Sequence, residues 1–188
     1  MTLTPVSRAE QLSVDITDNF FDIFGLPVSY QVDLKLLAER YRNLQRQFHP
    51  DKYAEKPARE QRLAEQYAAT INQAYSELKS PLRRAQYLLA LQGVDIDTDS
   101  AITRDPEFLM EQMTLREALS DVRDAENPFA ALTAVADEAG AHYRELQQAF
   151  AEQLQSDDMA QAGETVAKMQ FFNKLLDEVQ ALEHEIDE

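Results

Sequence analysis

The sequence is most informative at Leu44-Gln45-Arg46-Gln47-Phe48-His49-Pro50-Asp51-Lys52 (residues 44–52), where a helical pattern meets a proline. Proline disfavours a helical conformation in the residue before it, so the helix is expected to end near Phe48. The tripeptide His49-Pro50-Asp51 then begins a loop. Alone it is a weak signal, because these residue types usually form no more than a turn. Its significance depends on the segments on either side.

The segment before the loop, residues 33–48, has an apolar face and an opposite basic face. At about 100° per residue its large apolar side chains fall within roughly 80° of arc. They are Leu34, Leu37, Tyr41, Leu44 and Phe48. Lys35, Arg42 and Arg46 lie within roughly 40° of one another on nearly the opposite side. A solvated helix face is the ordinary explanation of such a basic stripe, and only the adjacent tripeptide favours a docking role.

The segment after the loop repeats the amphipathic pattern. Residues 59–78 follow Pro57 and place their apolar positions on one face: Leu63, Tyr67, Ile71, Ala74, Tyr75 and Leu78. Two such helices joined by a loop of about ten residues bury their apolar faces best as an antiparallel hairpin. The tripeptide is therefore expected at the hairpin tip. A short buried turn over residues 19–27 and a third helix over residues 81–91 complete this predicted domain.

Helix-start signals define the second half of the chain. Asp105-Pro106 and Asn127-Pro128 each combine a capping side chain with a proline suited to the first helical position, and Asp157-Asp158 begins a last segment. Three helices with short connections predict an antiparallel three-helix bundle, so the predicted fold class is all-α. The predicted domain limits are 1–18 for a flexible N-terminal extension, 19–92 for the hairpin domain, 93–104 for a short elbow-like linker and 105–188 for the bundle.

Composition excludes several classes of function. The 188 residues include no cysteine, which rules out disulfides, thiolate metal sites, cysteine-held iron–sulfur clusters and thiol catalysis in this chain. No apolar run approaches the roughly 18 residues of a membrane span. The first ten residues also lack the apolar centre of a signal peptide. We therefore expect a cytoplasmic protein with no membrane partner.

Charge differs sharply between the two halves. Residues 1–94 carry 12 Lys and Arg against 11 Asp and Glu, whereas residues 95–188 carry 6 against 23. The net charge is −16 and the pI is near 4.5. A nucleic-acid partner is not expected, because phosphate binding needs a concentrated basic face. For the acidic half, solubility is the simplest explanation.

Nothing in the sequence indicates an enzyme or a bound cofactor. No serine or carboxylate is spaced to form a recognisable triad with His49, and His142 and His184 lie alone on separate predicted helices. Clustered histidines are also lacking, so no metal site is expected. A helical enzyme that uses His49 as a general base is the alternative of a different class, and it would show turnover by the purified chain alone.

The helix that begins at Pro106 carries two apolar faces. One is an ordinary core stripe within roughly 60° of arc, formed by Phe108, Leu115, Leu119 and Val122. The other contains Leu109, Met110 and Met113. Two methionines favour an adaptable binding surface, although methionine more often fills gaps in a core. Periodicity alone favours core and interface about equally, and Phe171, at the margin of the last helix's core stripe, could join either.

The first domain resembles a J domain, the module through which co-chaperones stimulate ATP hydrolysis by chaperones of the heat-shock ATPase type. The resemblance rests on Phe24-Gly25-Leu26-Pro27, on the basic helix and on the tripeptide after it. It implies that the basic stripe docks on an acidic face of the ATPase. The tripeptide would contact the nucleotide domain and linker region. The implied contact residues are Lys35, Arg42, Arg46, His49, Pro50, Asp51 and Lys52.

From residue 19 to about residue 185 the chain resembles the HscB family, J-domain co-chaperones of iron–sulfur cluster biogenesis. Residues 69–74 contribute to this resemblance. The more specific motifs are Arg84-Ala85-Gln86-Tyr87-Leu88-Leu89 and Phe108-Leu109-Met110-Glu111-Gln112-Met113. Thr114 departs from the pattern, where an acidic residue is expected. By position, the resemblance implies a scaffold-binding surface formed by Leu109, Met110, Met113, Glu117 and Phe171.

The resemblance also implies the partners and the activity. The chain would stimulate the ATPase of a specialised HscA-type chaperone, deliver the scaffold protein IscU to it and so promote cluster maturation and transfer. Chemistry would stay with the ATPase. The nearest alternative is a J-domain co-chaperone whose acidic bundle serves a different client, and binding to scaffold versus unfolded polypeptide separates the two.

Overall fold

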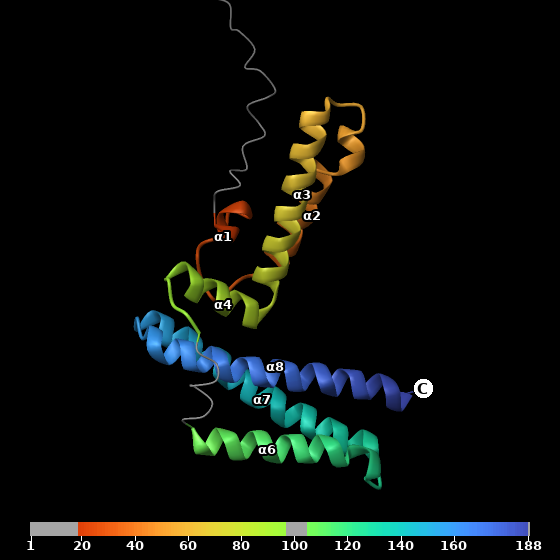
Figure 1. Ribbon diagram of the computed structural model, residues 1–188, viewed down its shortest axis with the longest axis vertical. Coiled ribbons are helices and arrows are strands. Elements are labelled where there is room, and N and C mark those ends of the chain that lie inside the picture. The colour runs from red at the N-terminus through yellow and green to blue at the C-terminus, as the bar shows by residue number, and fades with distance from the viewer. Residues whose placement is uncertain (1–18, 97–104, 188) are drawn as a thin grey trace, which may run out of the picture. The chain divides into compact units, whose positions relative to one another are not determined.

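The structure, a computed structural model, describes residues 19–96 and 105–187 (Figure 1). Within these ranges the chain forms seven α-helices and two short 3₁₀ turns and no strand, which confirms the predicted all-α class. It divides into two compact units, Met1–Arg83 and Arg84–Glu188. The predicted extension over residues 1–18 and most of the predicted linker lie outside the described ranges. The domain limits drawn from the sequence therefore stay predictions.

The first unit is built on a hairpin of two helices. Its elements follow one another as α1 (Phe20–Ile23), α2 (Leu34–Gln47), the 3₁₀ turn Pro50–Tyr53 and α3 (Ala58–Lys79). Tyr41 stacks on Tyr75 with 3.9 Å between ring centroids, and Phe48 lies 4.9 Å from Tyr67. Later positions on α2 thus meet earlier positions on α3, which makes the pair antiparallel. The predicted hairpin is confirmed, with the tripeptide in the loop that joins its helices.

A glycine turn holds α1 against the hairpin. Gly25 has a φ of +58°, a left-handed conformation that residues with a Cβ rarely adopt. The Arg40 guanidinium on α2 donates hydrogen bonds to the carbonyl oxygens of Phe24 and Gly25. A Cβ at position 25 would also lie only 3.1 Å from that guanidinium. Because Phe21 and Phe24 are buried, this short turn closes the core of the first unit.

α4 (Pro81–Leu91) begins with proline at its first position, as predicted. It ends in a glycine cap, since Gly93 has a φ of +71° and the Leu89 carbonyl oxygen accepts a hydrogen bond from the Val94 N–H at 3.0 Å. This is the Schellman arrangement, which satisfies carbonyl groups left open at a helix end. The division between the two units falls within this helix.

The second unit contains the three helices of the predicted bundle, α6 (Pro106–Asp121), α7 (Pro128–Gln155) and α8 (Met159–Asp187), with the 3₁₀ turn Val122–Asp124 after α6. α7 and α8 run side by side and α6 packs along them (Figure 1). Asp105, Asn127 and Asp158 each accept a hydrogen bond from a first-turn backbone N–H, at 3.0 to 3.1 Å. The predicted bundle and its caps are therefore confirmed.

The bundle core is aromatic at the start of α6. The Phe108 ring meets Phe171 and Phe172 on α8 edge-on, with centroids 5.8 and 5.9 Å apart. In the part of the chain described, the buried cluster comprises Phe108, Leu115, Val122, Leu132, Val135, Ala139, Phe171, Phe172, Leu175 and Val179. The predicted core stripe of α6 thus faces α7 and α8, which leaves its second apolar face to be explained.

Candidate docking surfaces

His49 closes the turn at the hairpin tip while most of its ring stays open. The backbone N–H of Asp51 donates to His49 Nδ1 at 3.3 Å, so the imidazole caps the 3₁₀ turn. A ring nitrogen that accepts this bond carries no proton, which places the hydrogen of the neutral ring on Nε2. For the same reason the 3.5 Å approach of Nδ1 to the Asp51 carboxylate is no second hydrogen bond. The side chains of His49 and Asp51 are 58% and 89% exposed.

The tip is anchored by the residue before it. Phe48 is 1% exposed and packs on Tyr67, so the chain enters the loop from a fixed point in the core. Pro50 and Lys52 are exposed on the turn that follows. The structure thus presents all three residues of the tripeptide, with Lys52 next to them, at one end of the hairpin.

The basic stripe on α2 is open to solvent. Lys35, Arg42 and Arg46 are all exposed, and within the described ranges none of them is in an ion pair. Arg46 instead donates to the Asn43 side chain and to the Arg42 carbonyl oxygen, which directs its guanidinium along the helix. Their charges are therefore available to a partner.

A surface hollow of about 610 Å³ joins the stripe to the tip. Its lining residues are Arg42, Gln45, Arg46, Phe48, His49, Pro50, Ala68 and Asn72. The contribution of α3 was not predicted from the sequence. Asn72 Oδ1 accepts a hydrogen bond from the Tyr41 hydroxyl at 2.9 Å, and Gln45 donates to that hydroxyl at 2.5 Å, so a polar network links the two helices beside the tip. The only sequence signal for it is the motif over residues 69–74.

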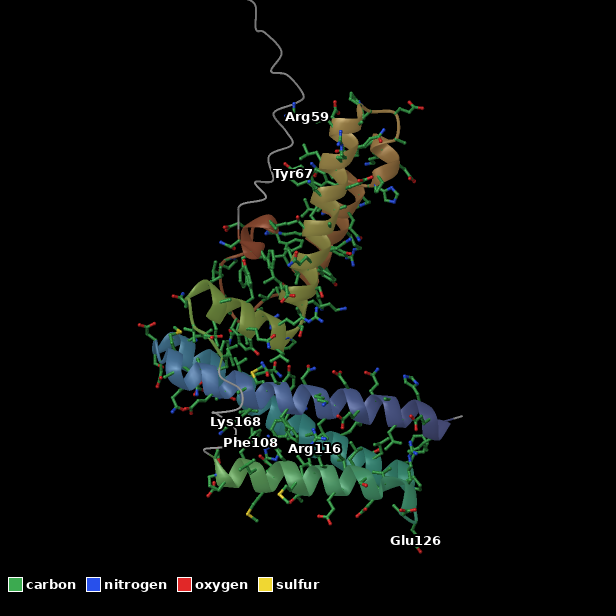
Figure 2. All side chains as sticks on the ribbon, viewed as in Figure 1. Arg59, Tyr67, Phe108, Arg116, Glu126 and Lys168 are labelled. Atoms are coloured by element: carbon green, nitrogen blue, oxygen red, sulfur yellow. The ribbon has the colours of Figure 1, made fainter. Side chains whose placement is uncertain are left out.

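The outer face of α6 carries the second candidate surface. Met110 and Met113 are each 71% exposed, Leu109 is half-buried and Glu117 is exposed. These four fall within roughly 100° of arc on the helix. Figure 2 shows sulfur atoms on the side of α6 that is turned away from α7 and α8. The second apolar face is therefore open at its two methionines, which the sequence left undecided.

Phe171 lies elsewhere, in the bundle core. It is 8% exposed and packs edge-on against Phe172 at 5.2 Å, in addition to Phe108. The Arg116 guanidinium lies 5.4 Å from the Phe171 ring centroid and 3.9 Å from the Glu178 carboxylate. Arg116 and Phe108 both reach from α6 toward α8 (Figure 2). The structure thus separates Phe171 from the four residues on the outer face and places Arg116 over its ring.

Polar side-chain contacts fix α6 on its neighbours. Lys168 Nζ lies 2.5 Å from Asp105 Oδ2 and 5.3 Å from the Phe108 ring centroid. The hydrogen bond from Lys168, together with that from the Phe108 backbone N–H, lowers the pKa of Asp105 from its ordinary value of 3.8. On the α7 side, His142 Nε2 lies 2.7 Å from Glu111. Contacts to both α7 and α8 therefore hold α6 in place, with its outer face exposed.

Among the described residues, no group of three or more His, Asp or Glu side chains is placed to hold a metal ion. Nor does any helix in those ranges combine the length and apolar character that crossing a bilayer requires.

Two family models match the chain in succession. The DnaJ domain model matches residues 19–87, and the model described as the HSCB C-terminal oligomerisation domain matches residues 104–180. A curated co-chaperone protein HscB homolog of Vibrio atlanticus (strain LGP32) is 44% identical over 165 residues, which cover 88% of this chain and 96% of that protein. The homolog of Aeromonas salmonicida (strain A449) is 42% identical over 170 residues, 90% and 99% of the two chains.

The chain belongs to the HscB family. Solved structures agree with this assignment. Chaperone HscB from Vibrio cholerae superposes with a TM-score of 0.81 at 41% identity, over 89% of this chain and 99% of that one. Human co-chaperone protein HscB gives a TM-score of 0.82 at 29% identity, over 89% and 83%.

Family membership confirms the main expectations drawn from the sequence. This HscB family member is a J-domain co-chaperone of iron–sulfur cluster assembly and is not an enzyme. Its J domain implies a partner ATPase of the Hsp70 type.

Proposed function

We propose that this HscB family member acts in the cytoplasm, stimulates an HscA-type chaperone ATPase through its hairpin tip, and delivers the scaffold protein IscU on the outer face of α6. One observation carries the proposal: the first unit exposes a basic surface and the second exposes an apolar one, and each suits a different partner. The first unit exposes cations beside His49-Pro50-Asp51, and the second exposes an apolar pair, Met110 and Met113.

The hairpin surface suits an encounter guided by charge. Lys35, Arg42 and Arg46 attract an acidic face at a distance and orient the approach, because exposed charges accelerate association more than they hold a complex. The tip, anchored by Phe48, then makes the specific contacts. His49 Nε2–H offers a donor, and Asp51, largely exposed, offers an acceptor. Hydrolysis of ATP takes place in the partner.

The α6 surface suits a protein with an apolar patch of its own. Met110 and Met113 supply adaptable apolar area at its centre, with the half-buried Leu109 beside them. Glu117 extends the face with a carboxylate, which adds specificity at the rim. Phe171 would contribute from within the bundle, by supporting α6 through its contact with Phe108.

One chain that binds both proteins raises their effective concentration for each other. This supports a delivery role: IscU reaches the ATPase already held by the co-chaperone. The same logic would apply to another client, so the client itself has to be tested.

The test is ATP hydrolysis by an HscA-type chaperone at limiting concentrations of this protein, with IscU, with an unfolded polypeptide, or with neither. We expect stimulation by this protein alone and a larger effect with IscU than with the polypeptide. Stimulation enhanced equally by any unfolded chain would contradict IscU delivery and favour a different client, and no stimulation would contradict the proposed ATPase partner.

A further inference from the structure

The sulfur of this chain is all in methionine, because the sequence contains no cysteine. Of its five methionines, four lie in the described residues. Met110 and Met113 are each 71% exposed, Met159 is half-buried and Met169 is fully buried in the second unit. Among the described residues, the two exposed thioethers, which are the most open of the four to oxidation, thus lie within about one helical turn of each other on the proposed scaffold-binding face.

We infer that Met110 and Met113 form an oxidation site through which peroxide releases the scaffold. The inference rests on the proposed function. Hydrogen peroxide transfers one oxygen atom to the thioether sulfur: the O–O bond breaks, an S–O bond forms, sulfur loses two electrons and peroxide is reduced to water. Methionine sulfoxide reductases reverse the step, since two thiols become a disulfide, the thioether returns and the oxygen leaves as water.

The physical basis is the change in polarity at the centre of an apolar contact. A thioether is flexible and apolar, whereas a sulfoxide carries a strong dipole and an oxygen that must be hydrogen-bonded when it is buried. Two polar side chains beside the methionines on this side of α6 offer a sulfoxide no hydrogen. The Thr114 hydroxyl already donates to the Met110 carbonyl oxygen at 3.0 Å, and an ionised Glu117 only accepts. Each buried sulfoxide should therefore raise the Kd for the scaffold about tenfold or more.

The hairpin itself, α2 to α3, contains no methionine and lies outside this chemistry. Residues 19–96 contain no methionine, so peroxide at doses that convert Met110 and Met113 leaves the tripeptide and the basic stripe unmodified. Oxidation would therefore uncouple the two activities: stimulation of the ATPase in the absence of IscU persists, while the additional effect of IscU is lost.

The experiment treats the full-length protein with dilute hydrogen peroxide and follows each methionine by peptide mass spectrometry. IscU affinity is measured by calorimetry before treatment, after treatment and after incubation with both epimer-specific sulfoxide reductases. We expect Met110 and Met113 to be oxidised before Met159 and Met169, to be protected by bound IscU, and to account for a loss of affinity that the reductases restore.

Two variants locate the effect. For Met110→Leu/Met113→Leu, the ratio of Kd after and before peroxide should stay near one, whatever its starting affinity. Met159→Leu should behave as the unaltered protein does, with the full rise in Kd. Equal affinity before and after complete oxidation of Met110 and Met113, or oxidation of Met159 and Met169 at the same rate, would overturn the inference. Failure of the untreated protein to bind IscU would instead overturn the proposed function, and the inference with it.

Discussion

His49 performs two tasks at the scale of a single residue. Its Nδ1 accepts a hydrogen bond from the Asp51 N–H and so shapes the turn, while more than half of its side chain is exposed. The local task alone would make it a stabilising cap, worth about 1 kcal/mol by analogy with helix caps. Its exposed part would make His49 a contact residue for the partner ATPase. A substitution separates the two, because a cap affects unfolding whereas a contact affects the partner.

Replacing His49 by Gln should abolish stimulation of the HscA-type ATPase. Unfolding in urea should shift by no more than about 1 kcal/mol, since only a cap of the short turn is weakened, and IscU affinity should not change. The matched control is His184→Gln, an exposed histidine near the end of α8, which should retain full stimulation. Undiminished stimulation by His49→Gln would contradict the role of the tripeptide.

Phe171 and the α6 methionines should respond in opposite ways to truncation. Phe171→Ala removes a ring that is 8% exposed, so it should cost about 3–5 kcal/mol of unfolding free energy. Met110→Ala/Met113→Ala removes exposed side chains, so its unfolding free energy should change by less than about 1 kcal/mol. IscU affinity should nevertheless fall by about 2 kcal/mol or more if the pair is a binding hot spot.

Urea unfolding and calorimetry with IscU measure the two effects. Phe129→Ala, an exposed apolar residue at the start of α7, is the matched control and should leave IscU affinity unchanged. Normal affinity of the methionine double variant would remove the outer face of α6 from the docking surface. If the Phe171→Ala protein were well folded but bound IscU more weakly, Phe171 would belong to the docking surface.

At the scale of elements, the start of α6 depends on one carboxylate. Asp105 caps the helix through the Phe108 N–H and also binds Lys168 on α8. Because the Lys168 hydrogen bond and the cap lower its pKa, the contribution of the ionised form is fully present above the ordinary value of 3.8. This stabilising contribution of Asp105 is lost as the pH falls from 3.8 through the lower pKa that the carboxyl group has in the folded protein.

Asp105→Asn isolates the bond to Lys168, since asparagine caps a helix about as well as aspartate. The unaltered protein should have the higher urea midpoint at pH 6, and the difference should shrink below pH 3.8. Because the pair is partly exposed, the effect is expected to be small. A difference that is constant from pH 6 to pH 3 would show that the ion pair contributes nothing and that the substitution acts through packing.

Periodicity predicted the elements well because it reports one buried face per helix. It predicted α2, α3 and the three bundle helices, and it placed the tripeptide in the connecting loop. Periodicity could not decide whether Phe171 belongs to the core or to a docking surface. The reason is that α8 contacts both α6 and α7, and so buries adjacent residues that point about 100° apart. Nor could it find the hydrogen bonds of Asn72 to α2, since polar contacts between helices depend on register. Nor could periodicity predict that Met110 and Met113 are exposed, because this depends on how α6 packs against α7 and α8.

At the scale of the whole molecule, the two halves differ in charge and should differ in their response to salt. Residues 1–94 are nearly neutral overall, with 12 basic against 11 acidic residues, yet three of the four cations of α2 lie in one stripe. The half with 23 acidic and 6 basic residues carries the apolar α6 face. Salt screens charges beyond about 10 Å at 0.1 M and leaves apolar burial in place.

Raising salt from low to physiological concentration should therefore slow association with the HscA-type ATPase far more than it changes IscU affinity. Stopped-flow association rates and calorimetry measure the two effects. Arg42→Ala should flatten the salt dependence of the ATPase rate, whereas Arg144→Ala, an exposed cation on α7, should not. If the ATPase rate were independent of salt, the stripe would be an ordinary solvated face. If IscU affinity fell as steeply with salt as that rate, charge rather than the methionine pair would hold the scaffold, because burial of thioethers does not weaken as ions are added.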